Sequence, residues 1–368
     1  MFINNEFIYL IKLLKKMCNN NMNKIIIKDN LDEINDINRC LDNFLLKFIK
    51  HDIKLDKNDY KQLCNNHINK QFIKNRIHKI ISYIKQLNKL KEYPLIEQRT
   101  KEWYELRNTC LTASDLYDGI NSNSLLLAKK KAGVYIDDTN FNHIKAIKWG
   151  TMFEDMAIRC YSQLNNNINI YEFGLITNNN ISNFGASPDG ITELGIMIEI
   201  KCPYKRILKK DYVPEKYYYQ IQGQLAVCEL EECDYVECYF KTYETDEEYI
   251  NEVKEKQFTN TNHGIIAEYL DKINDCYYYI YSDKNLTTEE CIENINIKIK
   301  NFNKENFVFQ TKTRWVLDNI YIQKIKYNIN FWENIPEKIK LFWNKVIECK
   351  SLPIEYKNKK KLEFIKDE

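Results

Sequence analysis

The sequence has almost no net charge and no closely spaced pair of cysteines. Its 54 Lys and Arg residues nearly balance 52 Asp and Glu residues, which excludes nucleic-acid binding through a uniformly basic surface. The 12 cysteines include no C-x-x-C pair, so neither a zinc ribbon nor a thioredoxin-like motif is indicated. Scattered cysteines of this kind are typical of reduced, partly buried thiols, and we expect an intracellular, cytoplasmic protein.

Long apolar runs are also missing. No stretch of about 18 uninterrupted apolar residues occurs, so a membrane span is not expected. In the opening segment, 1–17, lysines follow the apolar run instead of preceding it, which argues against a signal peptide. Glycine (9) and proline (6) are scarce, whereas Ile, Asn, Lys and Tyr are frequent. These four residues have AT-rich codons, so we expect the composition to reflect the genome more than the function.

Three regions differ in their patterns. Residues 1–92 carry apolar residues at three- and four-residue steps, which is typical of amphipathic helices that pack. The middle region, 93–255, mixes helical and strand-like segments and predicts an α/β fold with a mixed sheet. We expect the last region, 256–368, to be mainly helical again. In the middle region, the expected helices are 112–120, 149–165 and 215–229, and the expected strands are 170–177, 184–191, 196–202 and 234–240.

One predicted strand carries an acid and a base on the same face. Side chains alternate along a strand, so Glu199 and Lys201 share a face with Met197. The opposite face, with Ile198 and Ile200, is apolar and predicts a hydrophobic floor beneath the strand. Without further residues, this pattern would equally suit a surface hairpin with solvated charges.

A second acid is expected opposite the first. Residues 192–195 make a plausible hairpin turn, and a turn centred near Leu194 places Asp189 opposite Glu199. Cross-strand neighbours lie about 5 Å apart at their Cβ atoms, where two carboxylates repel each other. A divalent cation would relieve this repulsion. Oxygen ligands without a His or Cys cluster favour Mg²⁺ or Mn²⁺ over zinc.

Lys201 completes this arrangement. A lysine beside a metal-binding acid can orient or deprotonate the attacking water and stabilise charge on a phosphate. A bound metal ion lowers the pKa of that water and polarises the phosphoryl oxygen. The three residues together therefore indicate a metal-dependent nuclease.

These residues resemble a known family. Asp189 followed by Glu199-Ile-Lys201 matches the PD-(D/E)xK nuclease signature. The flanking Ala-Ser-Pro-Asp-Gly and Glu-Ile-Lys-Cys-Pro look like the YqaJ-like viral recombinase group, which includes the phage lambda-type exonuclease. The resemblance covers about 98–243. It implies a restriction-endonuclease-like α/β core with a mixed central sheet flanked by helices, to which this chain adds helical N- and C-terminal extensions.

Arg107 and Ser114 fit the first motif of that family, in which the arginine and the serine hold a terminal 5′-phosphate. We also expect Thr112 or Ser114 to cap a helix that begins there. The start of a helix binds phosphate, which agrees with the role that the resemblance implies. The alternative is that Ser114 is only a cap and Arg107 an ordinary surface ion-pair partner.

The resemblance extends to the metal site. It makes Glu154 an accessory metal ligand, although a solvent-exposed first-turn acid remains the alternative. It adds the main-chain carbonyl of Ile200 to Asp189 and Glu199 as ligands of one or two Mg²⁺ or Mn²⁺ ions. Gln220 is carried over as an active-site residue, and Gln224 shares its helical face.

A short basic stretch follows the predicted active-site strand. Its cations are candidates for contacts with the DNA backbone, and simple solvation is the alternative. The four residues are Lys205, Arg206, Lys209 and Lys210.

Two rival functions stay open at this point. A RecB-like, CRISPR-associated-type nuclease would carry an iron–sulfur cluster, but the cysteines after the core lack a compact spacing, and no cluster is expected. A non-catalytic DNA-binding recombination scaffold would not need the intact set of Asp189, Glu199 and Lys201. The resemblance instead implies a 5′→3′ exonuclease on linear double-stranded DNA. It is also compatible with a single-strand annealing protein or helicase as partner, with a homo-oligomer, and with the replication compartment of a large DNA virus.

Overall fold

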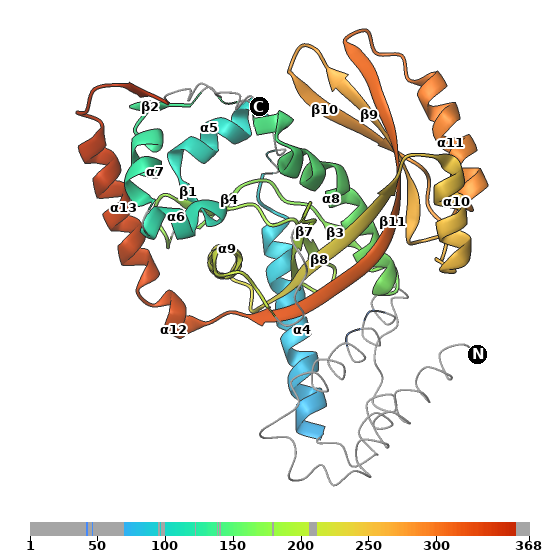
Figure 1. The fold of residues 1–368 in the computed structure, drawn as a ribbon. Helices are drawn as coiled ribbons and strands as arrows, with labels where there is room; N and C mark the ends of the chain where they lie inside the picture. The colour runs from blue at the N-terminus through green and yellow to red at the C-terminus, as the bar shows by residue number, and fades with distance from the viewer. Residues whose placement is uncertain are drawn as a thin grey trace, which may run out of the picture.

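The structure is a computed structural model (Figure 1), and it describes residues 42, 46, 70–94, 96, 100–121, 123–137, 139, 141–178, 180–205 and 212–357. Most of residues 1–69 of the predicted helical region 1–92 lie outside these residues, but Asp42 and Leu46 are both helical. The end of that region forms α4 (Lys70–Leu90). Within the described part of the chain, no helix is both long enough and apolar enough to cross a membrane.

A seven-stranded sheet lies at the centre of the molecule, in the strand order β10-β9-β11-β8-β7-β6-β3. β7 and β8 are parallel, and the other neighbouring pairs are antiparallel. The predicted α/β class with a mixed central sheet is therefore confirmed. The strands are β3 (Ile170–Tyr171), β6 (Gly190–Thr192), β7 (Met197–Lys201), β8 (Glu232–Tyr243), β9 (His263–Asp271), β10 (Cys276–Tyr281) and β11 (Phe307–Lys326).

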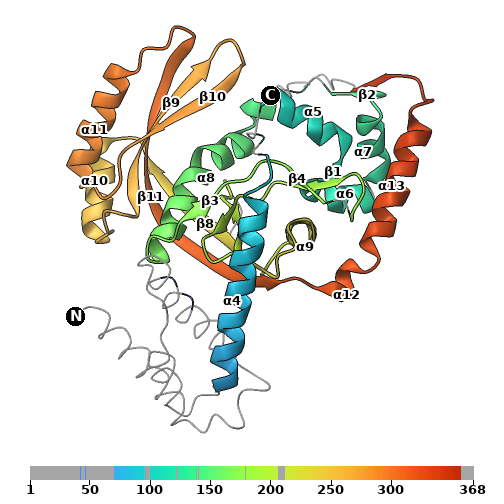
Figure 2. The same cartoon turned by 180° about the vertical axis from the view of Figure 1, so that it is seen from behind.

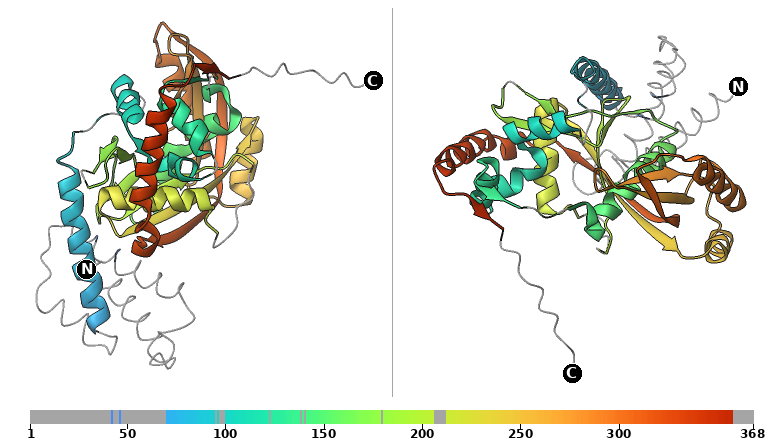
Figure 3. Two further views of the ribbon diagram at one scale, coloured as in Figure 1. Left: turned by 90° about the vertical axis from the view of Figure 1, so that its left-hand side faces the viewer. Right: turned by 90° about the horizontal axis from the view of Figure 1, so that it is seen from above.

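Helices pack on both sides of this sheet, and in Figures 1 and 3 α13 and α11 lie at opposite ends of the molecule. The principal helices are α5 (Lys101–Thr109), α6 (Leu116–Ile120), α7 (Ser124–Lys131), α8 (Lys145–Leu164), α9 (Glu215–Cys228), α10 (Asp246–Glu255), α11 (Thr288–Asn301), α12 (Ile329–Trp332) and α13 (Ile335–Cys349). The short 3-10 helices η1 (Ala113–Asp115) and η2 (Phe141–His143) precede α6 and α8. A small sheet joins β1 (Leu111–Thr112), β5 (Phe184–Ala186) and β4 (Ile176–Thr177), and β2 (Tyr135–Ile136) pairs with β12 (Glu355–Tyr356).

β7 separates two hydrophobic clusters, as its alternating sequence predicts. Ile198 and Ile200 belong to the cluster that contains Phe153 of α8. Met197, on the other face, belongs to the cluster that contains Leu225 of α9. The strand is thus buried on both sides, and an acid on the Met197 face enters the interior of the protein.

The prediction of a mainly helical segment after residue 256 is wrong. β9, β10 and β11 belong to the central sheet, and β11 pairs with β8 along the whole length of β8. Their sequences are rich in Ile, Val, Tyr, Phe and Thr, residues that suit a half-buried pleated surface. One continuous sheet therefore crosses the boundary predicted at 255.

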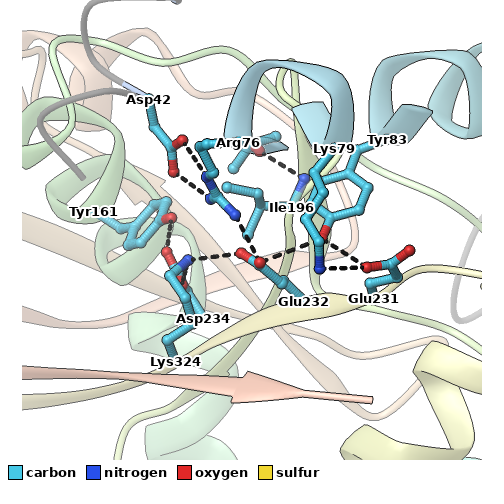
Figure 4. Close-up of polar contacts among 11 residues, drawn as sticks. Asp42, Arg76, Lys79, Tyr83, Tyr161, Ile196, Glu231, Glu232, Asp234 and Lys324 are labelled. Carbon is cyan, nitrogen blue, oxygen red and sulfur yellow. Dashed lines mark hydrogen bonds and ion pairs between the residues drawn. The ribbon is translucent and has the colours of Figure 1, made fainter. Parts of the chain in front are cut away.

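Buried charges connect α4 to the sheet (Figure 4). The guanidinium group of Arg76 donates to Asp42 at 2.8 and 2.6 Å and to Glu232 of β8 at 2.6 Å. Lys324 of β11 contacts Asp234 at 2.8 Å, and this carboxylate also accepts a hydrogen bond from Tyr161 of α8 at 2.7 Å. A buried charge is tolerated only when it is paired, so this network holds α4 and Asp42 in one position against the sheet.

We predict that Arg76→Met destabilises the protein by about 3–5 kcal/mol, because the buried Asp42 loses its cation and Glu232 keeps only Lys324, at 3.5 Å. Lys79→Met is the matched control on the same helix. Its ion pair with Glu231 is about half exposed, with side-chain exposures of 50% and 55%, and its loss should cost less than about 1 kcal/mol. Urea unfolding of both variants tests the difference. Equal losses of stability would contradict a buried network.

Candidate active site

The hairpin of β6 and β7 has the predicted register. Gly190 is paired with Ile198, and the next step of the same register places Asp189 opposite Glu199. Gly195 in the turn has a φ of +74°, and a Cβ there would lie 2.4 Å from the main-chain oxygen of Tyr83 in α4. The turn therefore needs glycine for two independent reasons, its backbone conformation and its contact with α4.

Glu199 is fully buried, and three side chains donate to its carboxylate. The amide of Gln220 donates to Oε1 at 2.7 Å, and the amide of Gln224 donates to Oε2 at 2.7 Å. Lys201 forms an ion pair with Oε1. Gln220 and Gln224 lie four residues apart on α9, so one helical face supplies both amides. The structure therefore places Gln220 beside the acids, where the resemblance put it.

Lys201 lies between the buried acid and an aromatic ring. Its Nζ is 4.9 Å from the ring centroid of Tyr217, an attractive cation–π position. Burial opposes the charged form, but the carboxylates of Glu199 and Asp189 outweigh it and raise the pKa of Lys201. In this state the side chain is an ammonium group that can donate hydrogen bonds toward the adjoining pocket.

A pocket of about 440 Å³ opens next to these residues, between the start of α8 and the end of β7. Asp189, Lys201 and Glu154 of α8 line it, together with Gly150 and Tyr217. A Cβ on Gly150 would meet no atom within 4 Å, so the helix leaves open space there. The structure therefore brings Glu154 to the same pocket as Asp189, as the resemblance implied.

Asp189 is in an environment that disfavours its charge. Burial and, next, the carboxylate of Glu199 raise its pKa well above the ordinary value, and Glu154 adds to the rise. Lys201 and the main-chain amide of Ile200, which donates to Asp189 Oδ2 at 2.6 Å, oppose it only in part. A cation between the acids would remove this repulsion.

The donor chemistry of the pocket fits a hard divalent cation. Asp189 and Glu154 offer carboxylate oxygens, and Ile200 lines the same space. Both oxygens of Glu199 accept hydrogen bonds from its three donors. Across the described ranges, no group of three or more His, Cys, Asp or Glu side chains is arranged around one ion position. Of the three predicted acids, Asp189 and Glu154 line the pocket, whereas Glu199 is fully buried next to Lys201.

Arg107 and Ser114 come together as predicted. Nη2 of Arg107 lies 3.4 Å from Ser114 Oγ and 3.4 Å from Thr112 Oγ1, and the two hydroxyl oxygens are 2.9 Å apart. The guanidinium group also stacks on Trp103, 4.4 Å from its ring centroid. The guanidinium group and the Ser114 hydroxyl therefore form a compact set of donors for an anion, and the Thr112 hydroxyl lies between them and Asp115.

The predicted helix cap at this place is wrong. Thr112 precedes η1, but its side chain makes no capping hydrogen bond; its hydroxyl donates to the carboxylate of Asp115 at 2.9 Å. α6 begins only at Leu116 and has five residues. The hydroxyl groups bond to neighbouring side chains instead of main-chain amides, so the helix-start part of the phosphate argument does not hold.

Trp103 and Ser187 link this donor set to the loop that carries Asp189. The indole Nε1 of Trp103 lies 3.4 Å from Ser187 Oγ, two residues before Asp189. Gln224 donates to the main-chain oxygen of Ser187 at 3.4 Å. Sequence reasoning did not assign Trp103 or Ser187 to the site, and it gave Thr112 only the role of a helix cap. Their positions within the matching motifs were the available signal.

The basic stretch after β7 is described only in part. Lys205 is exposed, and its Nζ lies 5.4 Å from the ring centroid of Tyr204, which lines the pocket. Arg206, Lys209 and Lys210 lie outside the described residues. The DNA-backbone role of this stretch stays a prediction.

The raised pKa of Asp189 predicts a gain in stability when its charge is removed. The folded protein holds a proton on Asp189 more tightly than the unfolded chain does, so this group favours folding at low pH. That contribution is lost as the pH rises from about 4 through the raised folded pKa. In excess chelator, Asp189→Asn should therefore melt at a higher temperature than the wild type at about pH 8.

The advantage of Asp189→Asn should shrink as the pH falls toward about 4, where the wild-type carboxyl group takes up its proton. Glu305→Gln, at an exposed position before β11, is the control and should match the wild type. Thermal melting at both pH values is the measurement. A lower melting temperature for Asp189→Asn at about pH 8 would rule out the repulsion described above.

Two solved structures resemble the model in part. An alkaline exonuclease from Laribacter hongkongensis is 17% identical, with 68% of this chain and 93% of that chain covered and a TM-score of 0.39. A phage-related exonuclease from Haemophilus somnus is 11% identical, with 65% and 94% covered and a TM-score of 0.38.

Sequence comparison is more specific. An uncharacterized protein of Acanthamoeba polyphaga mimivirus is 27% identical over 317 residues, which cover 74% of this chain and 57% of that protein. This chain therefore spans little more than half the length of that relative. Residues 102–231 match the family model described as the YqaJ-like viral recombinase domain. These residues include Arg107, Glu154, Asp189 and Glu199. The predicted resemblance to the YqaJ-like viral recombinase group is thus confirmed over residues 102–231.

Proposed function

We propose that this protein is a metal-dependent DNA exonuclease. The observation that carries the proposal is the pocket in which Asp189, Glu154 and Lys201 meet, with the buried Glu199 paired to Lys201. These residues belong to the segment that matches the YqaJ-like viral recombinase domain. The pocket and the match together point to phosphodiester hydrolysis.

Each residue of the pocket has a role in this proposal. Asp189, Glu154 and the main-chain carbonyl of Ile200 would hold one or two Mg²⁺ or Mn²⁺ ions, with Glu199 next to them. The metal, when bound, supplies Lewis-acid chemistry and a water molecule of lowered pKa. Lys201 would orient the attacking water and donate hydrogen bonds to the phosphate as charge develops on it.

Gln220 and Gln224 act one step away from the substrate. Their amides hold the Glu199 carboxylate, which in turn holds Lys201. The ammonium group is therefore fixed at the edge of the pocket before a substrate enters. Such fixed donors need little reorganisation during the reaction.

The donor set of Arg107, Thr112 and Ser114 supports action at a DNA end. A terminal 5′-phosphate carries more charge than an internal phosphodiester, so it gains more from a guanidinium group with two hydroxyls beside it. Trp103 and Ser187 connect this set to the loop that carries Asp189. We therefore propose 5′→3′ degradation of linear double-stranded DNA, with an endonuclease as the alternative.

The proposed biological setting draws on the relatives. The match to a viral recombinase domain and to a mimivirus protein supports a role in viral DNA recombination, repair or degradation, in the cytoplasmic replication compartment of a large DNA virus. A single-strand annealing protein or helicase is the proposed partner. A homo-oligomer is also part of the proposal.

We predict that linear DNA is hydrolysed in Mg²⁺ or Mn²⁺ and that excess chelator abolishes the reaction. Asp189→Ala and Lys201→Ala should each lower kcat by at least about 100-fold, because each removes a charge at the reacting phosphate. Glu305→Ala, at an exposed position away from the pocket, is the control. Release of nucleotides from end-labelled DNA is the measurement. Full activity of folded Asp189→Ala protein would refute the proposal.

The donor set predicts a preference for 5′-phosphorylated ends. Arg107→Ala should slow digestion of 5′-phosphate duplexes roughly 10- to 100-fold, the loss expected for a charge-assisted hydrogen bond, and should hardly affect 5′-hydroxyl duplexes. Lys101→Ala is the control on the same helix, because the side chain of Lys101 is 84% exposed. Cleavage of closed circular DNA, or no preference in the wild type, would instead indicate an endonuclease.

A further inference from the structure

α8 presents two different faces near its beginning. Ala146, Gly150 and Glu154 follow one another at four-residue steps and line the pocket. Lys148 and Met152 lie between these positions and make contacts elsewhere. The position of Glu154 in the pocket therefore depends on what the second face contacts.

That second face contacts strands from the C-terminal part of the chain, which we call the C-terminal arm (β9, β10 and residues 307–316 of β11). In Figures 1 and 2 the arm lies beside the first turns of α8. The arm lies entirely outside the residues that match the YqaJ-like domain, 102–231. Nothing in that match assigns it a role.

Two tyrosines of β10 reach the main chain of α8. The hydroxyl of Tyr279 lies 3.4 Å from the main-chain oxygen of Lys148, and the hydroxyl of Tyr281 lies 3.3 Å from that of Met152. The two residues are two apart on the strand, so they share one face. Tyr278, the residue before Tyr279, packs on the opposite side against Phe302 and Phe307.

An ion pair strengthens the same contact. Nζ of Lys148 lies 2.6 Å from Oε1 of Glu268 in β9, whose side chain is only 4% exposed. Glu268 pairs with Tyr279 across the two strands, which places both on the face toward α8. The ring of Tyr277 covers the same ammonium group at 3.9 Å. A buried carboxylate with a lysine partner is costly to disturb, so this contact resists displacement of α8.

Tyr281 is also close to the acids of α8. Burial and then the carboxylate of Asp155 raise the pKa of Tyr281, and Glu154 contributes to the same rise. The hydroxyl of Tyr281 therefore lies within electrostatic range of the residue that lines the pocket.

We propose that Glu268, Tyr279 and Tyr281 are positioning residues that hold the first turns of α8 so that Glu154 faces Asp189. The C-terminal arm is thus part of the active-site framework, and the matched domain alone would not keep the metal site formed. This inference rests on the proposed nuclease function. It adds that metal affinity depends on residues that touch neither the metal nor DNA.

Direct Mn²⁺ binding in the absence of DNA tests the proposal. Electron paramagnetic resonance titration should show roughly tenfold weaker binding for Glu268→Gln and for Tyr281→Phe than for the wild-type full chain, the effect typical of lost support behind metal ligands. DNA cleavage by both variants should be slower through a lower kcat, with an unchanged KM for DNA. The controls are Tyr278→Phe, on the other face of β10, and the exposed Glu305→Gln; both should bind Mn²⁺ like the wild type.

Hydrogen exchange provides the second readout. The amides of 146–154 should exchange faster in both arm variants than in the controls, while thermal melting verifies that each variant is folded. Wild-type Mn²⁺ affinity and wild-type exchange in either folded variant would overturn the proposal. If the wild type itself neither binds Mn²⁺ nor cleaves DNA, the nuclease function fails, and the role of the arm fails with it. If the wild type cleaves DNA and the arm variants bind Mn²⁺ like the wild type, only the proposed role of the arm is overturned.

Discussion

The buried carboxylate of Glu199 is the constraint on which the site depends. An ionised carboxylate in a fully buried strand would be very costly without partners. Lys201 from the same strand and two amides from α9 provide those partners. The requirement to satisfy this one charge fixes the distance between β7 and α9, holds Lys201 at the pocket, and places Asp189 beside a second negative charge.

The hairpin that carries Asp189 and Glu199 could be predicted from the sequence because everything that determines it is local. Side chains alternate with period two, the turn is short, and Gly195 supplies the positive φ that the turn needs. These three facts fix the cross-strand pairing without knowledge of any distant contact. The same holds for Gln220 and Gln224, whose common face follows from a four-residue spacing on one helix.

The arrangement of the C-terminal arm could not be predicted in this way. Its strands pair with β8 and with one another across long stretches of sequence, and the frequent Ile, Lys and Tyr residues obscure the difference between helical and strand patterns. The network of Arg76 has the same character, since its partners lie 34 and 156 residues away. At Thr112, an expected cap was replaced by hydrogen bonds between side chains, a local competition that sequence alone does not decide.

The two acids that line the pocket are therefore held by different means. Asp189 is fixed by the register of a hairpin within the matched domain, through bonds between adjacent strands. Glu154 arrives on a helix whose other face rests on the C-terminal arm. Because the two carboxylates repel each other without a cation, something has to oppose their separation. The hairpin can do this for one of them, and the contacts of α8 with Glu268 and Tyr281 do it for the other. A site that needs both is a property of the whole sheet, not of the matched motif alone.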